Sequence, residues 1–270
     1  MLLCSLGSSP SLGGERPVDR PTFFRESGLT LLRSGANTPH EVWCRCDAGP
    51  IGFLSTAAHG HADALSVEVR HGGTDILADP GTFCYQYQTR WREYFRSTSA
   101  HNTLEIDGVA QAKSMGPFIW THPVEARTVD VSVDPDCDRS SWIGSYHAKG
   151  HGGEVITHTR RVQVEGYEVT ISDQISKPAS VTLRFHLGAD VTCSLSESTA
   201  KLIWDSDDAG SDGVLELPPE LEWSMKRGQE DPLMGWYSAK FDVKVPANTL
   251  EGVGEASPDQ ALVSRLVFVS

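Results

Sequence analysis

The segment HGHADALSVEVRHGGTDILADPG, residues 59–81, decides the fold. Apolar and polar residues alternate from 65 to 69, a glycine pair at 72–73 predicts a turn, and an apolar run returns at 76–78. Alternation of period two on both sides of a glycine turn is typical of a β-hairpin. One strand would carry His61 near its start, and the other would carry Asp79 near its end. Antiparallel pairing would therefore bring these two side chains together.

A third residue whose side chain can bind a metal, His101, stands at the start of a further predicted strand. Single histidines in β proteins are mostly surface or packing residues, so none of these residues indicates a metal by itself. Two imidazoles and a carboxylate at adjacent strand ends, however, form a ligand set that Zn²⁺ accepts, with a fourth position for water or another group. The combination of His61, Asp79 and His101 therefore predicts a metal site, with His59 and Asp63 as supporting candidates.

Short alternating stretches recur along the rest of the chain and are separated by Asp-Gly and Glu-Gly turn signals. The connection at 81–100 is rich in aromatic residues and arginine, and long ordered connections are more often functional than idle. Many short strands without a long amphipathic helix predict an all-β protein, a large antiparallel β-sandwich with few or no helices. Residues 1–22 are expected to be a flexible leader, and residues 23–270 are expected to form the sandwich domain.

The chain has 270 residues and a formal net charge of −13. A surface of this charge argues against nonspecific binding of nucleic acid or of any other polyanion. No apolar run in the sequence is long enough to span a membrane. Six scattered cysteines give no disulfide framework, and Cys44 and Cys46 would lie on the same face of a strand.

An acidic ligand would therefore have to bind locally, and the arginines of the long connection offer one place. Arg90, Arg92 and Arg96 could bind carboxylates or sulfates through their guanidinium groups. The alternative is that these arginines pair with Glu93, Asp79 or main-chain carbonyls. The sequence favours neither of these two interpretations.

Three ordered motifs in and after the predicted hairpin carry a family resemblance. They are GHADALS at 60–66, ILADPGTF at 76–83 and WREYFRSTSAHNTL at 91–104. In this order they resemble the C-terminal β domain of the heparinase II/III-like family of polysaccharide lyases, which includes oligoalginate lyases. Weaker similarity extends the resemblance over residues 22–270 and implies a β-sandwich of the supersandwich type.

The resemblance implies that the chain takes part in cleaving uronic-acid-containing polysaccharides, such as heparan sulfate or alginate, by β-elimination. It implies that Zn²⁺ is held by His61, Asp79 and His101, and that Tyr87 or its neighbour Tyr85 carries a proton in the reaction. It also implies action in the cell envelope or periplasm, although the first residues do not form a clear signal peptide.

Complete members of the family carry an α/α-toroid domain before the β domain, and that domain supplies further residues to the cleft. The sequence shows no pattern for such a domain, so a separate toroid is a candidate partner, and activity of the chain by itself is left open. An alternative is a noncatalytic carbohydrate-binding or assembly β-sandwich whose metal is structural. A zinc hydrolase of the metallo-β-lactamase type is disfavoured, because Ala64 follows Asp63 where that fold requires a further histidine.

Overall fold

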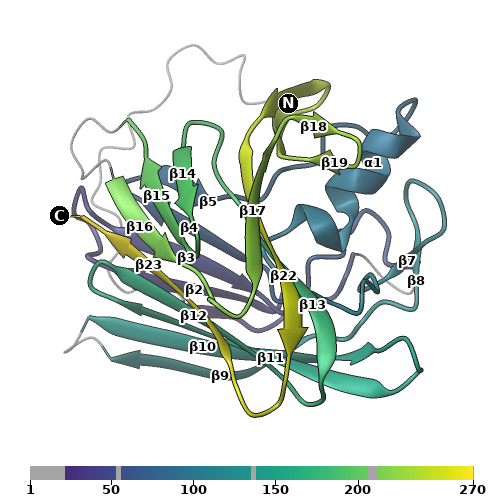
Figure 1. The fold of residues 1–270 in the computed structure, drawn as a ribbon, viewed down its shortest axis with the longest axis horizontal. Helices are drawn as coiled ribbons and strands as arrows, with labels where there is room; N and C mark the ends of the chain where they lie inside the picture. Colours follow the sequence, from purple (N-terminus) through teal and green to yellow (C-terminus); the bar gives the residue numbers. More distant parts are fainter. Residues whose placement is uncertain (1–21, 53–55, 135–137, 206–211, 270) are drawn as a thin grey trace.

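The computed structural model describes residues 22–52, 56–134, 138–205 and 212–269. Antiparallel strands make up nearly all of its regular structure, with one short α-helix, so the all-β prediction is confirmed (Figure 1). The predicted leader, residues 1–22, lies outside the described residues apart from its last residue. None of the helices in the described part is long and apolar enough to cross a membrane.

The predicted hairpin forms one edge of a five-stranded sheet. In order across the sheet, its strands are β1 Phe23–Phe24, β2 Leu29–Ser34, β3 Val42–Asp47, β4 Val67–His71 and β5 Thr74–Leu77. β4 and β5 pair antiparallel, with Val69 opposite Leu77, as predicted. β4 begins only at Val67, however, so His61 lies on the loop before the strand and not within it.

The largest sheet has eight strands. They are β9 Arg127–Asp134, β10 Arg139–Lys149, β11 Val155–Glu165, β12 Glu168–Ile175, β14 Thr192–Ser196, β15 Thr199–Ile203, β16 Asp212–Glu216 and β23 Leu262–Phe268. Their order across the sheet is β14-β15-β16-β23-β12-β11-β10-β9. Buried and less buried residues alternate along β11, as expected for a strand with one face toward a core.

A four-stranded sheet is formed by β6 Leu104–Ile106, β13 Ala179–His186, β17 Glu222–Arg227 and β22 Asn248–Ala256, in the order β17-β22-β13-β6. Three small hairpins are β7 Lys113–Ser114 with β8 Trp120–Thr121, β18 Gln229–Glu230 with β19 Leu233–Met234, and β20 Trp236–Lys240 with β21 Val243–Pro246. The Ala78 amide donates to the His186 carbonyl at 2.9 Å, which joins the end of β5 to the end of β13.

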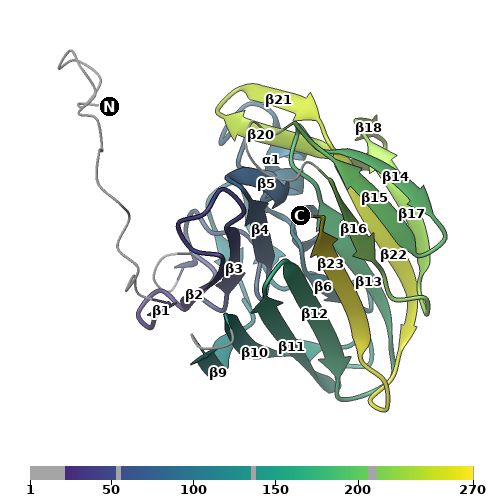
Figure 2. The same cartoon turned by 90° about the vertical axis from the view of Figure 1, so that its left-hand side faces the viewer.

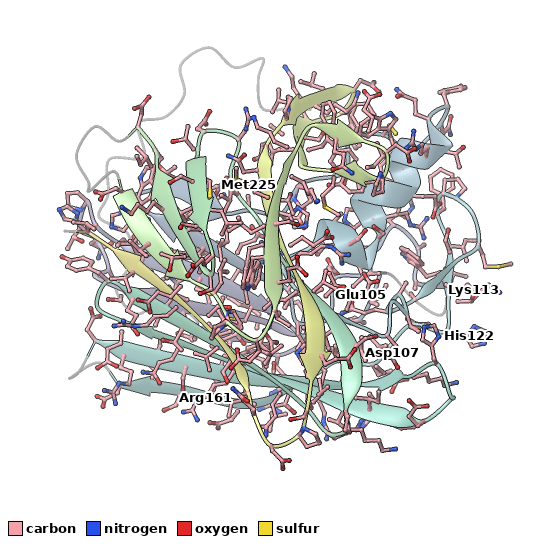
Figure 3. The ribbon with its side chains drawn as sticks, viewed as in Figure 1. Glu105, Asp107, Lys113, His122, Arg161 and Met225 are labelled. Atoms are coloured by element: carbon pink, nitrogen blue, oxygen red, sulfur yellow. The ribbon has the colours of Figure 1, made fainter. Side chains whose placement is uncertain are left out.

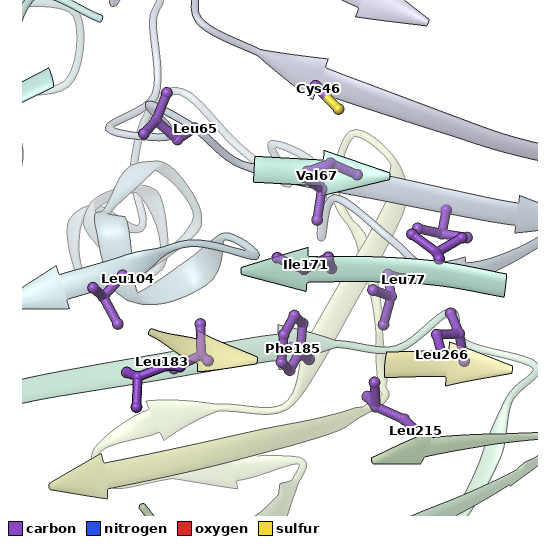
Figure 4. Close-up of a cluster of buried hydrophobic side chains, with 14 of the residues drawn as sticks. Cys46, Leu65, Val67, Leu77, Leu104, Ile171, Leu183, Phe185, Leu215 and Leu266 are labelled. Atoms are coloured by element: carbon purple, nitrogen blue, oxygen red, sulfur yellow. The ribbon is translucent and has the colours of Figure 1, made fainter. Parts of the chain in front are cut away.

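All three large sheets contribute to one apolar core. Leu77, Ile171 and Phe185 come from the five-, eight- and four-stranded sheets and meet in it (Figure 4). Each is at most 1% exposed. Burial of one such side chain stabilises a fold by about 1.5–3 kcal/mol, so the core holds the three sheets, and the loops between them, in fixed positions.

A second, smaller apolar cluster lies around the one α-helix, α1 Thr89–Arg96, which is followed by the 3₁₀ helix η2 Thr98–Ala100. Phe95 is fully buried there and packs with residues of the β18–β19 hairpin. Helix α1 therefore occupies the long connection at 81–100 that the sequence left without an element. Figure 2 shows the β20–β21 hairpin beside α1, and Figure 3 places Lys113 and His122 together where the β7–β8 hairpin joins the rest of the chain.

Candidate metal centre

Four side chains from three segments converge beside the β4–β5 hairpin. They are His61 and Asp63 on the loop before β4, Asp79 two residues after the end of β5, and His101 directly after η2. One ligand-type atom from each residue lies within 4.8 Å of the corresponding atoms of the others. The three residues predicted as metal ligands are therefore brought together, and Asp63 joins them.

Asp79 and His101 lie close together in this cluster, with 2.9 Å between Oδ2 of Asp79 and Nδ1 of His101. The Gly81 amide donates to the other carboxylate oxygen of Asp79 at 2.8 Å. Burial by itself would raise the pKa of Asp79, but His101, His61 and the Gly81 amide together hold that pKa well below its usual range. Burial would lower the pKa of His101, and the adjacent Asp79 carboxylate outweighs it and raises that pKa. Asp79 is therefore an anion at neutral pH.

Burial is the main cause of the pKa shifts of His61 and Asp63, the other two members of the cluster. Burial, and then the neighbouring His101, lower the pKa of His61 to about 3, so its imidazole is neutral and keeps a free lone pair at pH 7. Burial raises the pKa of Asp63 to about 7. Nε2 of His101 is buried and has no hydrogen-bond partner among the described residues. A buried ring nitrogen without a hydrogen-bond partner, beside a neutral imidazole and a carboxylate, suits a metal ion that displaces its proton.

The loop that carries His61 and Asp63 is fixed through its main chain. Gln111 makes two hydrogen bonds with Ala64: its Oε1 accepts from the amide at 2.8 Å, and its Nε2 donates to the carbonyl at 3.0 Å. The Thr103 hydroxyl donates to the same carbonyl at 2.8 Å. A buried arginine, Arg160, donates to the carbonyl of Leu65 at 2.8 Å. These contacts hold the loop in place, including Leu65, whose φ of 57° is in the left-handed region.

Asn102, the residue after His101, joins three strands behind the cluster. Its side-chain amide donates to the carbonyls of Val67 at 2.8 Å and Ala78 at 3.0 Å. Its side-chain oxygen accepts from the amide of His186 at 2.6 Å. Because Val67 starts β4 and Ala78 follows β5, this one side chain positions the hairpin ends next to the candidate metal ligands.

A cleft of about 420 Å³ opens onto the cluster. The guanidinium of Arg45 is the one Lys or Arg head group among the described residues that line it, and it already pairs with Glu68 at 2.9 Å and Asp47 at 3.7 Å. The carboxylates in the lining thus outnumber its arginine, and such a surface favours a cation. The lining residues are Arg45, Asp47, Pro50, Gly52, His59, Gly60, His61, Asp63, Glu68 and Asp79.

The two candidate catalytic tyrosines lie in different surroundings. Tyr85 is half-buried, and its ring centre is 5.5 Å from that of His59, which lines the cleft. Tyr87 is 98% exposed and has a φ of 67°. Tyr85 therefore contacts a wall of the cleft, whereas the side chain of Tyr87 is in solvent. A role of either tyrosine in proton transfer stays a prediction.

The three arginines predicted to bind an acidic ligand also differ in their surroundings. Arg92 and Arg96 are buried, and they donate to the carbonyls of Pro117 at 3.0 Å and Gly116 at 2.6 Å, respectively. Arg90 is exposed and donates to a carbonyl of the β18–β19 hairpin. Burial lowers the pKa of Arg96 to about 10, which still leaves its guanidinium charged at neutral pH. The role of these arginines in substrate binding stays a prediction.

Several residues of the site were not assigned from the sequence alone. Asp63 was only a supporting candidate, although its spacing after His61 places both on one short loop. Arg45 and Glu68 occupy adjacent strands and lie directly opposite each other, a pairing that depends on strand order. Asn102 is adjacent to a predicted ligand, and its bonds join strands that are distant in sequence. Arg45, Glu68 and Asn102 could have been identified only from the order of the strands in the sheets.

Comparison with known proteins adds the family. No curated protein matches the chain in sequence. The heparan sulfate lyase HepC from Pedobacter heparinus is similar in fold, with a TM-score of 0.70 and 14% identity over 93% of this chain and 37% of that one. A structure of heparinase III gives 0.70 and 15% identity over 95% and 38% of the two chains. A heparinase III that is the BT4657 gene product gives 0.68 and 18% identity over 92% and 36%.

These structural likenesses concern the fold, and this chain spans little more than a third of each of those proteins. The family described as heparinase II/III-like, C-terminal, matches residues 16–263. This match includes all three motifs from which the resemblance was inferred, and it extends over most of the sequence. The chain therefore belongs to the heparinase II/III-like, C-terminal family.

Proposed function

We propose that this chain is the zinc-binding C-terminal β-sandwich part of a lyase that cleaves uronic-acid-containing polysaccharides by β-elimination. The observation that carries the proposal is the convergence of His61, Asp79 and His101 beside an open cleft, in a chain of this family. Zn²⁺ is the proposed ion, because two neutral imidazole nitrogens and one carboxylate are a common zinc ligand set. Asp63 supplies a fourth ligand-type oxygen.

The reaction requires three chemical tasks. A base removes the proton at C5 of the uronic acid, the electrons form the C4–C5 double bond, and the C4–O bond breaks as an acid protonates the leaving oxygen. A bound zinc ion would supply positive charge next to the substrate carboxylate. Tyr85 is the proposed proton carrier, because its ring contacts His59 in the cleft wall, and Tyr87 is the alternative.

Arg90, Arg92 and Arg96 are the proposed contacts for acidic groups of the substrate. Support for a heparan sulfate- or alginate-like substrate comes from the resemblance to heparan sulfate lyase and from the uronic acids that this chemistry needs. Since the chain spans 36–38% of the similar proteins, we further propose that an α/α-toroid domain, in the same or another chain, supplies the opposite wall of the cleft. The cell envelope or periplasm is the proposed location.

The test is to incubate the purified chain, alone and with a family toroid domain, with heparan sulfate and with alginate. The ultraviolet absorbance of the conjugated 4,5-unsaturated product should rise strongly only when both domains are present. The zinc content of the protein, measured by mass spectrometry, should be close to one ion per chain. A zinc-loaded chain that cleaves neither polymer with any toroid would favour the alternative, a noncatalytic carbohydrate-binding or assembly β-sandwich with a structural metal.

A further inference from the structure

Four ring side chains from distant parts of the sequence form a continuous row. The row starts at the cleft that opens onto His61, Asp63 and Asp79, which we call the metal cleft. The ring of His59 lies 5.5 Å from that of Tyr85 and 5.6 Å from that of Phe118. Tyr85 and Phe118 stack at 5.7 Å with 14° between their planes. Phe241 continues the row at 5.5 Å from Tyr85. The row therefore leads from the cleft wall to the turn of the β20–β21 hairpin.

Phe241, at the outer end of the row, is 60% exposed. Single exposed apolar side chains are common in soluble proteins and need no explanation by themselves. Phe241 differs because its ring is in contact with other rings that reach a polar cleft. It also lies on a segment that is firmly attached to the protein, as the contacts of the hairpin show.

The β20–β21 hairpin is fixed to the segment that follows Asp79. The Ser238 amide donates to the Pro80 carbonyl at 2.8 Å, and the Asp242 amide donates to the Phe83 carbonyl at 2.8 Å. Main-chain bonds on both sides of Phe241 thus attach its turn. The ammonium of Lys244 lies 4.2 Å from the ring centre of Trp91 in α1 and 4.7 Å from that of Phe83, which are favourable cation–π distances.

Phe118, in the middle of the row, lies on the turn between β7 and β8 and is held just as closely. The His59 amide donates to the Phe118 carbonyl at 3.2 Å. Arg96 donates to the carbonyl of Ile119 at 3.0 Å, and Arg92 donates to that of Pro117 at 3.0 Å. The guanidinium of Arg92 also lies 4.5 Å from the ring centre of Tyr85. Contacts from α1 therefore fix the positions of Phe118 and Tyr85 in the row.

The charge of the neighbouring cleft gives a reason for such a surface. Asp47, Asp63, Glu68 and Asp79 line the cleft, and a polyanion there gains little from its own charge beyond what a metal ion contributes. An apolar ring face beside the cleft adds a contact that does not depend on charge. The ring of a pyranose sugar presents aliphatic C–H groups on its faces, and these pack on aromatic rings.

We propose that Phe241, supported by Tyr85 and Phe118, is a sugar-stacking subsite that receives a pyranose unit next to the unit held at the metal cleft. This inference rests on the proposed function for the identity of the ligand, a uronic-acid-containing oligosaccharide. Phe241 is a binding residue, and it contacts the ring face of a sugar that is not itself cleaved. The subsite takes its ligand by shape and apolar contact, so it accepts both epimers of the uronic acid.

The test is a binding measurement by calorimetry on the zinc-loaded chain with heparan sulfate and alginate hexasaccharides. Phe241→Ala should weaken binding by about three- to tenfold, the range expected for one aromatic contact, and Phe241→Trp should retain it. The loss should be the same at low and at high salt, because stacking is not screened. Phe24→Ala removes a ring that is 40% exposed on β1 and is the matched control, with unchanged binding expected.

The outcomes separate this inference from the proposed function. Binding that depends on Phe241 in a chain that shows no lyase activity with any toroid would support the subsite and count against the lyase. A fully active lyase whose affinity and KM are unchanged by Phe241→Ala would overturn the subsite and leave the lyase intact. Failure of the unaltered chain to bind either hexasaccharide would also overturn the subsite. Thermal unfolding of each variant confirms that the comparison is made between folded proteins.

Discussion

Nδ1 of His101 lies 2.9 Å from Oδ2 of Asp79, and both nitrogens of this buried ring are without a hydrogen bond of good geometry among the described residues. The adjacent carboxylate raises the pKa of His101, so a metal ion that binds the ring would displace a proton from it. The pair is organised before any ion binds. The hydrogen bond from the Asn102 side chain to the Ala78 carbonyl fixes the main chain at the end of β5, and so fixes the position of Asp79 relative to His101.

Replacement of a predicted ligand should remove the metal. His61→Ala and His101→Ala should each lower zinc affinity by more than about tenfold, since even changes in the outer shell of a zinc site have effects of this size. Mass spectrometry of protein dialysed against trace zinc measures the bound ion. His122→Ala, at an exposed position outside the cleft, is the control and should keep full zinc content. Unchanged zinc in His61→Ala would remove that residue from the site.

Asn102→Ala should destabilise the fold more than an ordinary buried asparagine substitution. It leaves two carbonyls and one amide of three strands without their partner, and each buried unsatisfied group costs about 1–3 kcal/mol. Asn248→Ala is the matched control, because Asn248 is also buried but makes one such side-chain bond, to Val191 at 3.1 Å. Urea unfolding gives both values. Equal losses would show that Asn102 has no special joining role.

A buried charge pair beneath the site should be sensitive to the loss of one partner. Arg160 donates to both carboxylate oxygens of Asp173, at 2.7 and 2.9 Å, and both residues are buried. Asp173→Asn leaves the guanidinium uncompensated and should lower the free energy of unfolding by about 3–5 kcal/mol. Glu168→Gln, which breaks the exposed pair with Arg265, should change it by less than about 1 kcal/mol. Similar values for the two variants would contradict this account.

Stability should fall in mild acid because of His186. Burial, with His101 and Arg184 adding to it, lowers the pKa of His186 to about 3 in the folded protein, whereas the unfolded residue titrates near its ordinary value of 6.5. Between these values only the unfolded chain takes up the proton. The contribution of the neutral His186 to the free energy of unfolding is therefore fully present above pH 6.5. It is lost as the pH falls toward 3, by about 1.4 kcal/mol per pH unit.

The measurement is a set of urea unfolding curves for the metal-free protein between pH 7.5 and 5. His186→Gln should be less stable at pH 7.5, because Nδ1 and Nε2 of His186 lie 3.0 Å from the Thr249 hydroxyl and 3.1 Å from the Ser99 carbonyl. It should nevertheless lose less stability than the unaltered protein as the pH falls. Parallel curves for the two proteins would show that another group is responsible.

The proposed role of Tyr85 as proton carrier is tested by removal of its hydroxyl. In the lyase assay with the toroid domain present, Tyr85→Phe should lower kcat by about 100-fold or more, the contribution expected of a positioned proton carrier. Tyr167→Phe, at a 41% exposed tyrosine on the β11–β12 turn, should leave activity unchanged. A large loss in Tyr87→Phe with an active Tyr85→Phe would move the role to Tyr87.

The strands that could be predicted from the sequence are those with clean alternation. β4 and β5 were found because a glycine turn separates two apolar patterns, and β11 and β12 follow the recurring alternation because one face of each is buried. β22 does not show this alternation, since its glycines interrupt the pattern. A Cβ at Gly252 would lie 2.6 Å from the ring of Trp223, so that glycine is required by packing across the sheet, which a single sequence does not show.

Helix α1 was missed for a related reason. It has two turns, and its preceding residue, Gln88, makes no capping hydrogen bond through its side chain. Its stability comes from tertiary contacts, such as the packing of Phe95 in the small apolar cluster. The residues predicted as ligands lie together in the structure, because each stands next to a recognisable strand or motif. The partners that hold them, such as Gln111 and Arg160, come from parts of the chain that only the fold brings near.

Helix α1 has a consequence for how this domain could be altered. Arg90 contacts the β18–β19 hairpin, Trp91 the β20–β21 hairpin, and Arg96 the β7–β8 turn. The three hairpins do not pair with one another, and all of them contact the same two turns of helix. Exchange of one hairpin between relatives would disturb its contacts with the helix. Residues 80–121 and 228–246 should therefore be exchanged between relatives only together, as one unit.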